Sequence, residues 1–570
     1  MIQQSSQPRP DRASAAEAHR DRLGDRLYAG GPIITLDPAH PGPDAVAVRG
    51  NRIVAVGSLA DARAALGADA QTFDLGGRTL IPGLIDSHCH LVSSVRSHTL
   101  YVDGHVPPNR SIADLLARIS ERARRAPEQQ WIIVHGSHFG ARKFLERRYP
   151  TRSELDAIAP RHPVLILDGR HTYRVNSVAL AMLGIDGPQS PALRPGFAVV
   201  DRATGELSGE LKSVNHLFPD RRHTESEAFE YIRDVVPELW VARGFTSVQA
   251  FMDPLEFRAC QTLAGLRRLP LRITAHIFDS AGRFGALDTA IAAGLATGLG
   301  NEWLRVGGAK LFVDGAFMSY TAASRAPYLD MACPCYRGLL KLEPAVLSDA
   351  VRRAHEASLQ VCIHAMGDRA QELALDAIEA ALLAHPRPDA RHRIEHFGCD
   401  MGAPDLRARA RELGVVPNMT TGWLYSYGDY VEEKLGTARL REFMALRSIL
   451  DAGLEPCNSS DQTGTEWLTL DPFFSIWCAV RRKTFNGQVL TPEQAISVEE
   501  ALRMFTTNAA RASFEEGIKG SVTPGKLADF TILDRNPLTI DPDELRQVAV
   551  DETIIDGRSA YRRPVLEMQR

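Results

Sequence analysis

Two patterns of hydrophobic and polar positions alternate along the middle of the chain. Short apolar runs bounded by Gly, Pro or Asn are typical of buried strands, and segments with apolar residues every three or four positions are typical of helices. Helical segments include 371–385 and 445–453. The strand candidates are 84–91, 245–251, 271–278, 305–313, 359–366, 391–397, 414–419 and 454–460. Eight strand–helix units predict an α/β fold, a distorted (β/α)₈ TIM barrel of parallel strands.

The two ends of the chain have a different texture, with short alternating runs broken by turns. We therefore predict that residues 26–82 and 508–565 pair into one small composite β-sandwich, behind a flexible leader at 1–25. The barrel then occupies 83–507. The stretch from about 95 to 240 is too long for one crossover and carries strands and helices of its own, so we predict an inserted subdomain there.

Composition narrows the possible partners. The 570 residues are 44% hydrophobic and 24% charged, with a net charge of −4, which gives no reason to expect nucleic acid or an anionic membrane as partner. No run is apolar enough for a membrane span, and the polar N-terminus lacks the apolar core of a secretory signal. The eight cysteines do not form a disulfide framework, so we expect reduced thiols and a cytoplasmic protein. Cys333 and Cys335 are expected to be two loop thiols, with a metal or redox role as the alternative.

Side chains suited to metal binding follow the predicted strands. The carboxyl ends of barrel strands form the catalytic face. His88 and His90 end the first strand, and their spacing of two points both imidazoles the same way. A histidine that follows an apolar strand is by itself more often a core residue. Here, however, five strands place a possible ligand at the same end, and this joint pattern predicts a metal site. The remaining candidates are Lys310, His364, His396 and Asp461.

Lys310 lies inside the apolar run AKLFV, and a buried lysine is costly unless its charge is paired or removed. Two interpretations are open. The lysine forms an ion pair, for which Asp314 is a candidate, or it reacts with CO₂ to give a carbamate that bridges two metal ions.

Several dispersed motifs occur in the order expected of one family. They are LIPGLIDSHCHL, AKLFVDGAFMS, VCIHAMGDRA, HRIEHF, NSSD and TPGKLADFTILD. With these motifs the chain resembles the amidohydrolase superfamily. DGRHTYRVNSVAL, GDYVEEKLG and SSDQTGTEWLTLDP further resemble the YtcJ-like branch, amidohydrolase family 3. The resemblance runs from about residue 26 to 565 and implies the same barrel with a composite β-domain.

The resemblance also implies roles for the candidate ligands. His88 and His90 would bind one divalent metal ion, most simply zinc, and His364 and His396 a second. Carboxylated Lys310 would bridge them, and Asp461 would be both ligand and proton shuttle. One or two ions per chain and a homo-oligomer are expected on the same basis.

The chain departs from the family pattern in three places. Gln249 stands where relatives commonly have a histidine, and His138 where an acidic residue is more usual. Gln462, Thr463 and Gly464 follow Asp461 in place of proline and apolar residues. Because these positions are expected near the pocket, the substrate cannot be carried over from any relative.

The expected reaction is hydrolysis of a C–N bond in a small molecule, an amide or N-substituted formamide. Metal-activated water attacks, Asp461 shuttles the proton, and His171 of the insert assists at the oxyanion. Substrate contacts are expected from the insert and from the segment after strand seven, at Tyr173, Asn176, Trp423 and Tyr425.

Other functions stay open. A deaminase of an aminated heterocycle is one alternative, although Gly367 occupies the position where such enzymes often carry a glutamate. An esterase or lactonase would use the same machinery. A non-catalytic binding protein of the same fold would be expected to lack some of the six ligand positions, and all six are occupied. A metal store is disfavoured because one barrel mouth holds few ions.

Overall fold

The computed structural model describes residues 24–168, 172–187, 189–190, 198–200, 205–212, 217–218, 223–278, 285–331, 333–462 and 466–564. At its centre eight strands form one sheet in the order β19-β18-β17-β16-β15-β14-β13-β6. They are β6 (Leu84–Cys89), β13 (Phe245–Met252), β14 (Arg272–Ile277), β15 (Leu304–Phe312), β16 (Gln360–His364), β17 (Arg393–Glu395), β18 (Val416–Met419) and β19 (Cys457–Asn458). Every neighbouring pair is parallel.

The sheet curls into a nearly closed barrel. Its first and last strands meet through two hydrogen bonds: Ser87 Oγ donates to Asn458 O at 2.7 Å, and Asp461 N donates to His88 O at 2.9 Å. Every residue of β6 and β13 is buried, which explains why these strands are continuous apolar runs. The predicted TIM barrel is confirmed.

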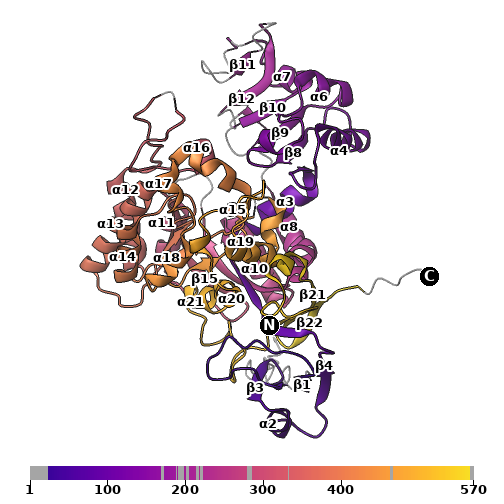
Figure 1. Cartoon of the computed structure of the whole chain (residues 1–570), viewed down its shortest axis with the longest axis vertical. Helices are drawn as coiled ribbons and strands as arrows, with labels where there is room; N and C mark the ends of the chain where they lie inside the picture. The colour runs from indigo at the N-terminus through magenta and orange to yellow at the C-terminus, as the bar shows by residue number, and fades with distance from the viewer. Residues whose placement is uncertain are drawn as a thin grey trace, which may run out of the picture.

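Helices lie between the strands and pack around the barrel (Figure 1). They include α10 (Pro254–Gly265), α12 (Pro344–Glu356), α13 (Asp368–Ala384) and α14 (Pro404–Glu412). The sequence of α13 is rich in Ala, Leu and Glu, which favour helix, and its small residues Ala370, Ala374 and Ala381 are buried. We would expect Asp368 to cap this helix, but the N-cap is Gly367; the Asp368 carboxylate instead accepts Arg325 N at 2.8 Å.

The two ends of the chain build a pair of four-stranded sheets. The first has the order β3-β2-β1-β4, from β1 (Asp25–Ala29), β2 (Ala45–Arg49), β3 (Arg52–Gly57) and β4 (Gln71–Asp74). The second has the order β22-β21-β20-β5, from β5 (Thr79–Pro82), β20 (Phe530–Leu533), β21 (Val550–Ile555) and β22 (Arg558–Arg562). Tyr28 and Phe530, from opposite ends of the chain, pack edge to face at 5.5 Å in one apolar core.

A separate six-stranded sheet lies between β6 and β13 in sequence, in the order β11-β12-β10-β9-β8-β7. Its strands are β7 (Val102–Gly104), β8 (Ile132–Gly136), β9 (Val164–Asp168), β10 (Thr172–Val175), β11 (Ala198–Val200) and β12 (Leu207–Lys212). Figure 1 shows it at the opposite end of the molecule from β1–β4. It has its own apolar core, so this insert folds on itself rather than extending the barrel.

The cysteines differ in part from expectation. Cys333 and Cys335 are joined in a disulfide, so the expectation of two free thiols in this loop is wrong. The other six cysteines are buried free thiols. Among the described residues, no helix has the combined length and apolarity that crossing a membrane requires.

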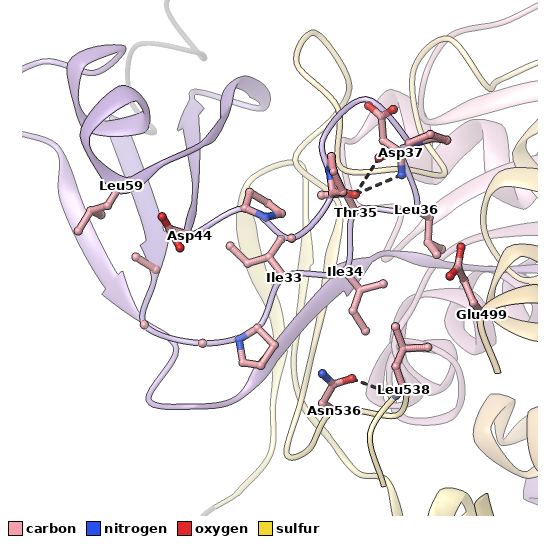
Figure 2. Close-up of a pocket in the computed structure, with 18 of the residues that line it drawn as sticks. Ile33, Ile34, Thr35, Leu36, Asp37, Asp44, Leu59, Glu499, Asn536 and Leu538 are labelled. Carbon is pink, nitrogen blue, oxygen red and sulfur yellow. Dashed lines mark hydrogen bonds between the residues drawn. The ribbon is translucent and has the colours of Figure 1, made fainter.

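A groove of about 990 Å³ lies where the segment from Gly30 to Asp44 passes the C-terminal part of the chain (Figure 2). Ile33, Ile34 and Leu36 line it from one side, and Glu499 and Leu538 from the other. None of the predicted site residues is among its lining residues, so the groove is separate from the barrel mouth.

Candidate metal centre at the barrel mouth

The two histidines after strand one do point to the same place. His88 is the fifth residue of β6, and His90 begins the turn into α3 (Leu91–Leu100). Their ring centroids are 5.5 Å apart. The Nε2 atoms of His88 and His90 lie 3.3 and 3.6 Å from the same atom, Asp461 Oδ1. Three ligand-type atoms from the first and last strands therefore surround one point.

His396 brings strand six to the same point. Its Nε2 lies 3.9 Å from Asp461 Oδ2, and its ring centroid lies 5.0 Å from that of His88. Ligand atoms of His88, His396 and Asp461 lie within 4.8 Å of one another, a spacing that a metal ion can bridge. Both His396 (φ 69°) and Asp461 (φ 43°) adopt the left-handed backbone region. This conformation costs a non-glycine residue about 1–3 kcal/mol and tends to occur at functional sites.

Lys310 and His364 complete the cluster. Lys310 Nζ lies 3.3 Å from His88 Nε2 and 4.2 Å from the centre of the Phe251 ring. Burial lowers the pKa of Lys310 to about 8. The His364 ring lies 4.8 Å from that of His396, and its Nε2 is 2.9 Å from Gly315 O. The structure thus brings all six predicted ligand side chains together at the carboxyl ends of the strands.

Asp314, the candidate ion-pair partner of Lys310, has a different task. Its carboxylate accepts backbone N–H groups of Ala323 (2.8 Å), Met366 (3.0 Å) and Gly367 (2.9 Å). It therefore ties the loop after β15 to the loop after β16. The ammonium of Lys310 faces His88 instead, in agreement with a lysine that belongs to the metal cluster.

A buried ion pair orients His88, and sequence reasoning missed it. Glu395 Oε2 lies 2.7 Å from His88 Nδ1, and Arg393 Nε donates to Glu395 Oε1 at 2.8 Å. Burial would raise the pKa of Glu395, but Arg393 lowers it overall. Burial, with Lys310 nearby, holds the pKa of His88 well below its usual value. The ring is therefore neutral, donates from Nδ1 to Glu395 and directs the Nε2 lone pair into the cluster, as metal-binding histidines usually do.

Asp86 holds the loop that carries Asp461. It accepts Ser460 N at 2.9 Å, Ser460 Oγ at 2.6 Å and Trp240 Nε1 at 2.9 Å. A signal for both supporting groups was present in the sequence: Arg393 and Glu395 have strand spacing on one face, and Asp86 interrupts an apolar strand.

Two of the departures from the family pattern have structural explanations. Gln249 Oε1 accepts from Arg393, and its Nε2 donates to Ala509 O at 2.6 Å, so it supports the ion pair from strand two. His138 of the insert reaches the mouth, where its ring meets Tyr427 edge to face at 5.5 Å.

The predicted substrate residues of the insert are placed differently. His171 lies outside the described residues. The Tyr173 ring is buried 4.9 Å from Phe218 inside the insert. Asn176 is fully buried; its Oδ1 accepts Val164 N at 2.9 Å and caps α7 (Ser177–Met182). The structure therefore gives Tyr173 and Asn176 packing roles and does not bring them to the metal cluster.

The two aromatic residues after strand seven point in opposite directions. Both lie on α15 (Trp423–Tyr427), two positions apart. Trp423 stacks on His396 at 4.9 Å with an interplanar angle of 27°. Tyr425 packs instead against Phe474 at 5.2 Å, on the side away from His396. Only Trp423 joins the metal cluster.

A parallel barrel with imidazoles, a lysine and an aspartate at its carboxyl ends is the architecture of metal-dependent hydrolases. A solved structure of an uncharacterized metal-dependent hydrolase from Pyrococcus horikoshii is similar, with a TM-score of 0.70 and 25% identity, covering 91% of this chain and 99% of that one. The family model described as the amidohydrolase family matches residues 71–561, and the chain belongs to this family.

Two curated relatives agree. The chain is 29% identical to the N-substituted formamide deformylase of Arthrobacter pascens over 562 residues, 95% of this chain and 99% of that protein. It is 27% identical to the putative amidohydrolase YtcJ of Bacillus subtilis over 554 residues, 94% of this chain and 99% of that protein. The predicted YtcJ-like branch is confirmed, as is the class of enzyme, a hydrolase of C–N bonds other than peptide bonds.

Proposed function

We propose that the protein hydrolyses the C–N bond of a small linear amide, with an N-substituted formamide as the first candidate, and that it uses zinc at the barrel mouth. The observation that carries this proposal is the convergence of His88, His90 and His396 on Asp461, with each histidine Nε2 3.3 to 3.9 Å from a carboxylate oxygen of Asp461. The deformylase relative supports the choice of a formamide.

The residues present fit a divalent cation. The donor set contains four imidazoles and a carboxylate, which suit zinc, and the depressed pKa of His88 and His396 keeps both rings neutral, as ligands must be. A zinc ion held there supplies Lewis-acid polarisation of the carbonyl and activates water near neutral pH.

The chain's own groups then handle the protons. Asp461 has both carboxylate oxygens directed at the cluster, Oδ1 toward His88 and His90 and Oδ2 toward His396. It accepts the proton that the attacking water loses and returns it to the nitrogen of the leaving amine. The hydrogen bond from its own backbone N–H to His88 O keeps this carboxylate in place.

Lys310 is proposed to be carboxylated. With a pKa of about 8, a substantial fraction of the amine is neutral near physiological pH. The neutral nitrogen forms a bond to the carbon of CO₂ and loses one proton to solvent, which leaves a carbamate anion. This change would remove the cation beside His88 and would add anionic oxygen donors to the cluster.

The deaminase alternative finds less support. A glutamate at position 367 would protonate a leaving amine in such an enzyme, but a Cβ at Gly367 would overlap the backbone of Ala323. The loop after β15, which contains Ala323, therefore excludes a side chain at this position.

A panel of substrates with the same benzyl group tests the proposal. Zinc-loaded protein would be incubated with N-benzylformamide, N-benzylacetamide and benzyl formate, and also with cytosine. Benzylamine and formate would be measured for the amides and ester, and ammonia for cytosine. We expect release of benzylamine from the amides, fastest from the formamide, which is lost after chelation and restored by zinc. Ammonia from cytosine alone, or cleavage of the ester alone, would contradict the proposal.

A further inference from the structure

Two polar atoms on one face of α15 are buried at the barrel mouth. Trp423 Nε1 and Tyr427 Oη have no hydrogen-bond partner among the described residues. The two residues are four positions apart on the helix, so their side chains lie on the same face. That face is the one that contacts the metal cluster, because Trp423 stacks on His396.

The rings form a continuous wall from the metal cluster to the insert. The Tyr427 ring lies 5.4 Å from Trp423, and His138 of the insert meets Tyr427 at 5.5 Å. Burial raises the pKa of Tyr427 well above its usual value, and Asp461 is near enough to contribute in the same direction. The phenol is therefore protonated and available as a donor.

Two other buried phenols of the molecule have partners, whereas Tyr430 Oη resembles Tyr427 Oη in having none among the described residues. Tyr149 Oη donates to Ser137 O at 3.0 Å, and Tyr328 Oη donates to Ala322 O at 3.0 Å. Leaving a buried hydroxyl without a bond costs about 1–3 kcal/mol. At Tyr427 this cost is avoided if a ligand or water supplies the partner, and the position beside Trp423, which itself stacks on His396, favours a ligand of the reaction.

We propose that Trp423 and Tyr427 form the oxygen-binding wall of the substrate site, where the hydroxyl of Tyr427 and the indole N–H of Trp423 donate to the carbonyl oxygen of the amide. This inference rests on the proposed function. The indole N–H can only donate and the protonated phenol also donates here, so the bound group is an acceptor. The wall therefore recognises the acyl oxygen and not the amine part of the substrate.

Binding to an inactive protein tests this inference directly. Zinc-loaded Asp461→Asn protein would be titrated with N-benzylformamide and N-benzylacetamide in a calorimeter, with and without Tyr427→Phe. We expect Tyr427→Phe to weaken binding of both amides roughly 5- to 10-fold, the effect of one neutral hydrogen bond. The midpoint of thermal unfolding is expected to stay the same or rise, because the hydroxyl has no partner among the residues that the structure describes.

Tyr149→Phe is the matched control. It also removes one buried hydroxyl, but from a phenol that is bonded to Ser137 O inside the insert. We expect it to lower the unfolding midpoint and to leave amide affinity unchanged. In the active enzyme, Tyr427→Phe is further expected to lower kcat/KM while zinc content stays the same.

The outcomes separate the two proposals. Equal amide affinity with and without the Tyr427 hydroxyl would overturn the oxygen-binding wall alone. If neither amide binds the Asp461→Asn protein and neither is cleaved by the wild type, the amidase proposal fails and the wall fails with it.

Discussion

The two ends of the barrel both bury charged side chains, but they space them differently. At the amino end, Arg272 bonds both oxygens of Asp529 at 2.7 and 3.0 Å, and Lys519 Nζ lies 2.8 Å from Glu515. At the carboxyl end, the Nε2 atoms of His88, His90 and His396 stand 3.3, 3.6 and 3.9 Å from Asp461. The charged groups at the amino end are in direct hydrogen-bond contact, whereas the ligand atoms at the carboxyl end stand farther apart.

This difference separates structural charges from functional ones. Buried charges that only hold a fold together are expected to be at hydrogen-bond distance from their partners, as those of the amino end are. Ligand atoms that share a metal ion must stand further apart, because the ion lies between them. Glu395 and Arg393 support the ligands of the carboxyl end from behind. They are again in direct contact, with hydrogen bonds of 2.8 and 3.0 Å.

The largest expected effect comes from Asp461→Asn. The amide keeps the shape of the side chain but cannot accept the proton of the attacking water. We expect kcat to fall by about 10²–10⁴, the contribution of a positioned general base. Steady-state kinetics with N-benzylformamide would measure this, with the unfolding midpoint as a control for the fold. A variant with near-normal turnover would refute the role of Asp461.

Arg272→Met should destabilise the amino end of the barrel without changing the catalytic activity. The guanidinium is 1% exposed and bonds Asp529 and Asp556. Its loss leaves two buried carboxylates without their cation, which costs about 3–5 kcal/mol of the free energy of unfolding. Urea titration would measure the loss. Activity per folded molecule should be unchanged; if instead kcat fell with stability intact, the division between the two ends would be wrong.

Glu395→Gln should weaken metal binding without removing a ligand. Groups that orient a metal-binding histidine typically contribute 10–100-fold to affinity. We therefore expect zinc affinity to fall by about 10–100-fold. Competition with a zinc-binding dye would measure it. Gln249→Ala is the control. It should lower zinc affinity less, because the Gln249 side chain contacts Arg393 and not His88.

The last prediction concerns acid stability. Burial lowers the pKa of His392 to about 3; Val361 N donates to its Nδ1 at 3.1 Å, and its Nε2 lies 2.9 Å from His355 Nδ1. Because this pKa is below that of the unfolded chain, the unfolded state binds more protons between about pH 6.5 and 3. The neutral His392 therefore stabilises the fold above about pH 6.5. The free energy of unfolding falls by up to about 1.4 kcal/mol for each pH unit below 6.5.

His392→Asn should flatten this dependence. The Asn carbonyl can accept Val361 N in place of Nδ1 but does not titrate. Unfolding free energies measured by urea from pH 7 to 4 are expected to fall less steeply in the variant. Parallel curves for the two proteins would show that His392 does not govern acid stability.

The sequence was sufficient for much of this architecture. Periodicity located all eight barrel strands, because parallel strands buried on both faces are uninterrupted apolar runs. The ligands could be predicted because each follows such a run. The supporting layer could not be predicted as easily, since the bond between His88 and Glu395 joins residues that are distant in sequence. The prediction that Tyr425 contacts substrate has no support in the structure, because the sequence does not tell which face of a short helix meets the barrel.

The loop disulfide was missed for a different reason. Cys333 and Cys335 are close enough to bond only because the loop folds back on itself, and spacing alone does not reveal this. Asn176 is predicted to contact substrate as part of an insert segment that folds over the barrel mouth, but the strand before it, β10, belongs to the insert's own sheet.

Metal analysis tests the central claim most directly. Zinc per chain would be measured by mass spectrometry in the purified wild type and in a His88→Ala/His396→Ala double variant, after dialysis against metal-free buffer. We expect one or two zinc ions per chain in the wild type and almost none in the variant, with both proteins folded. A wild type without metal after reconstitution, or a variant that keeps the full zinc content, would contradict a metal centre at this mouth.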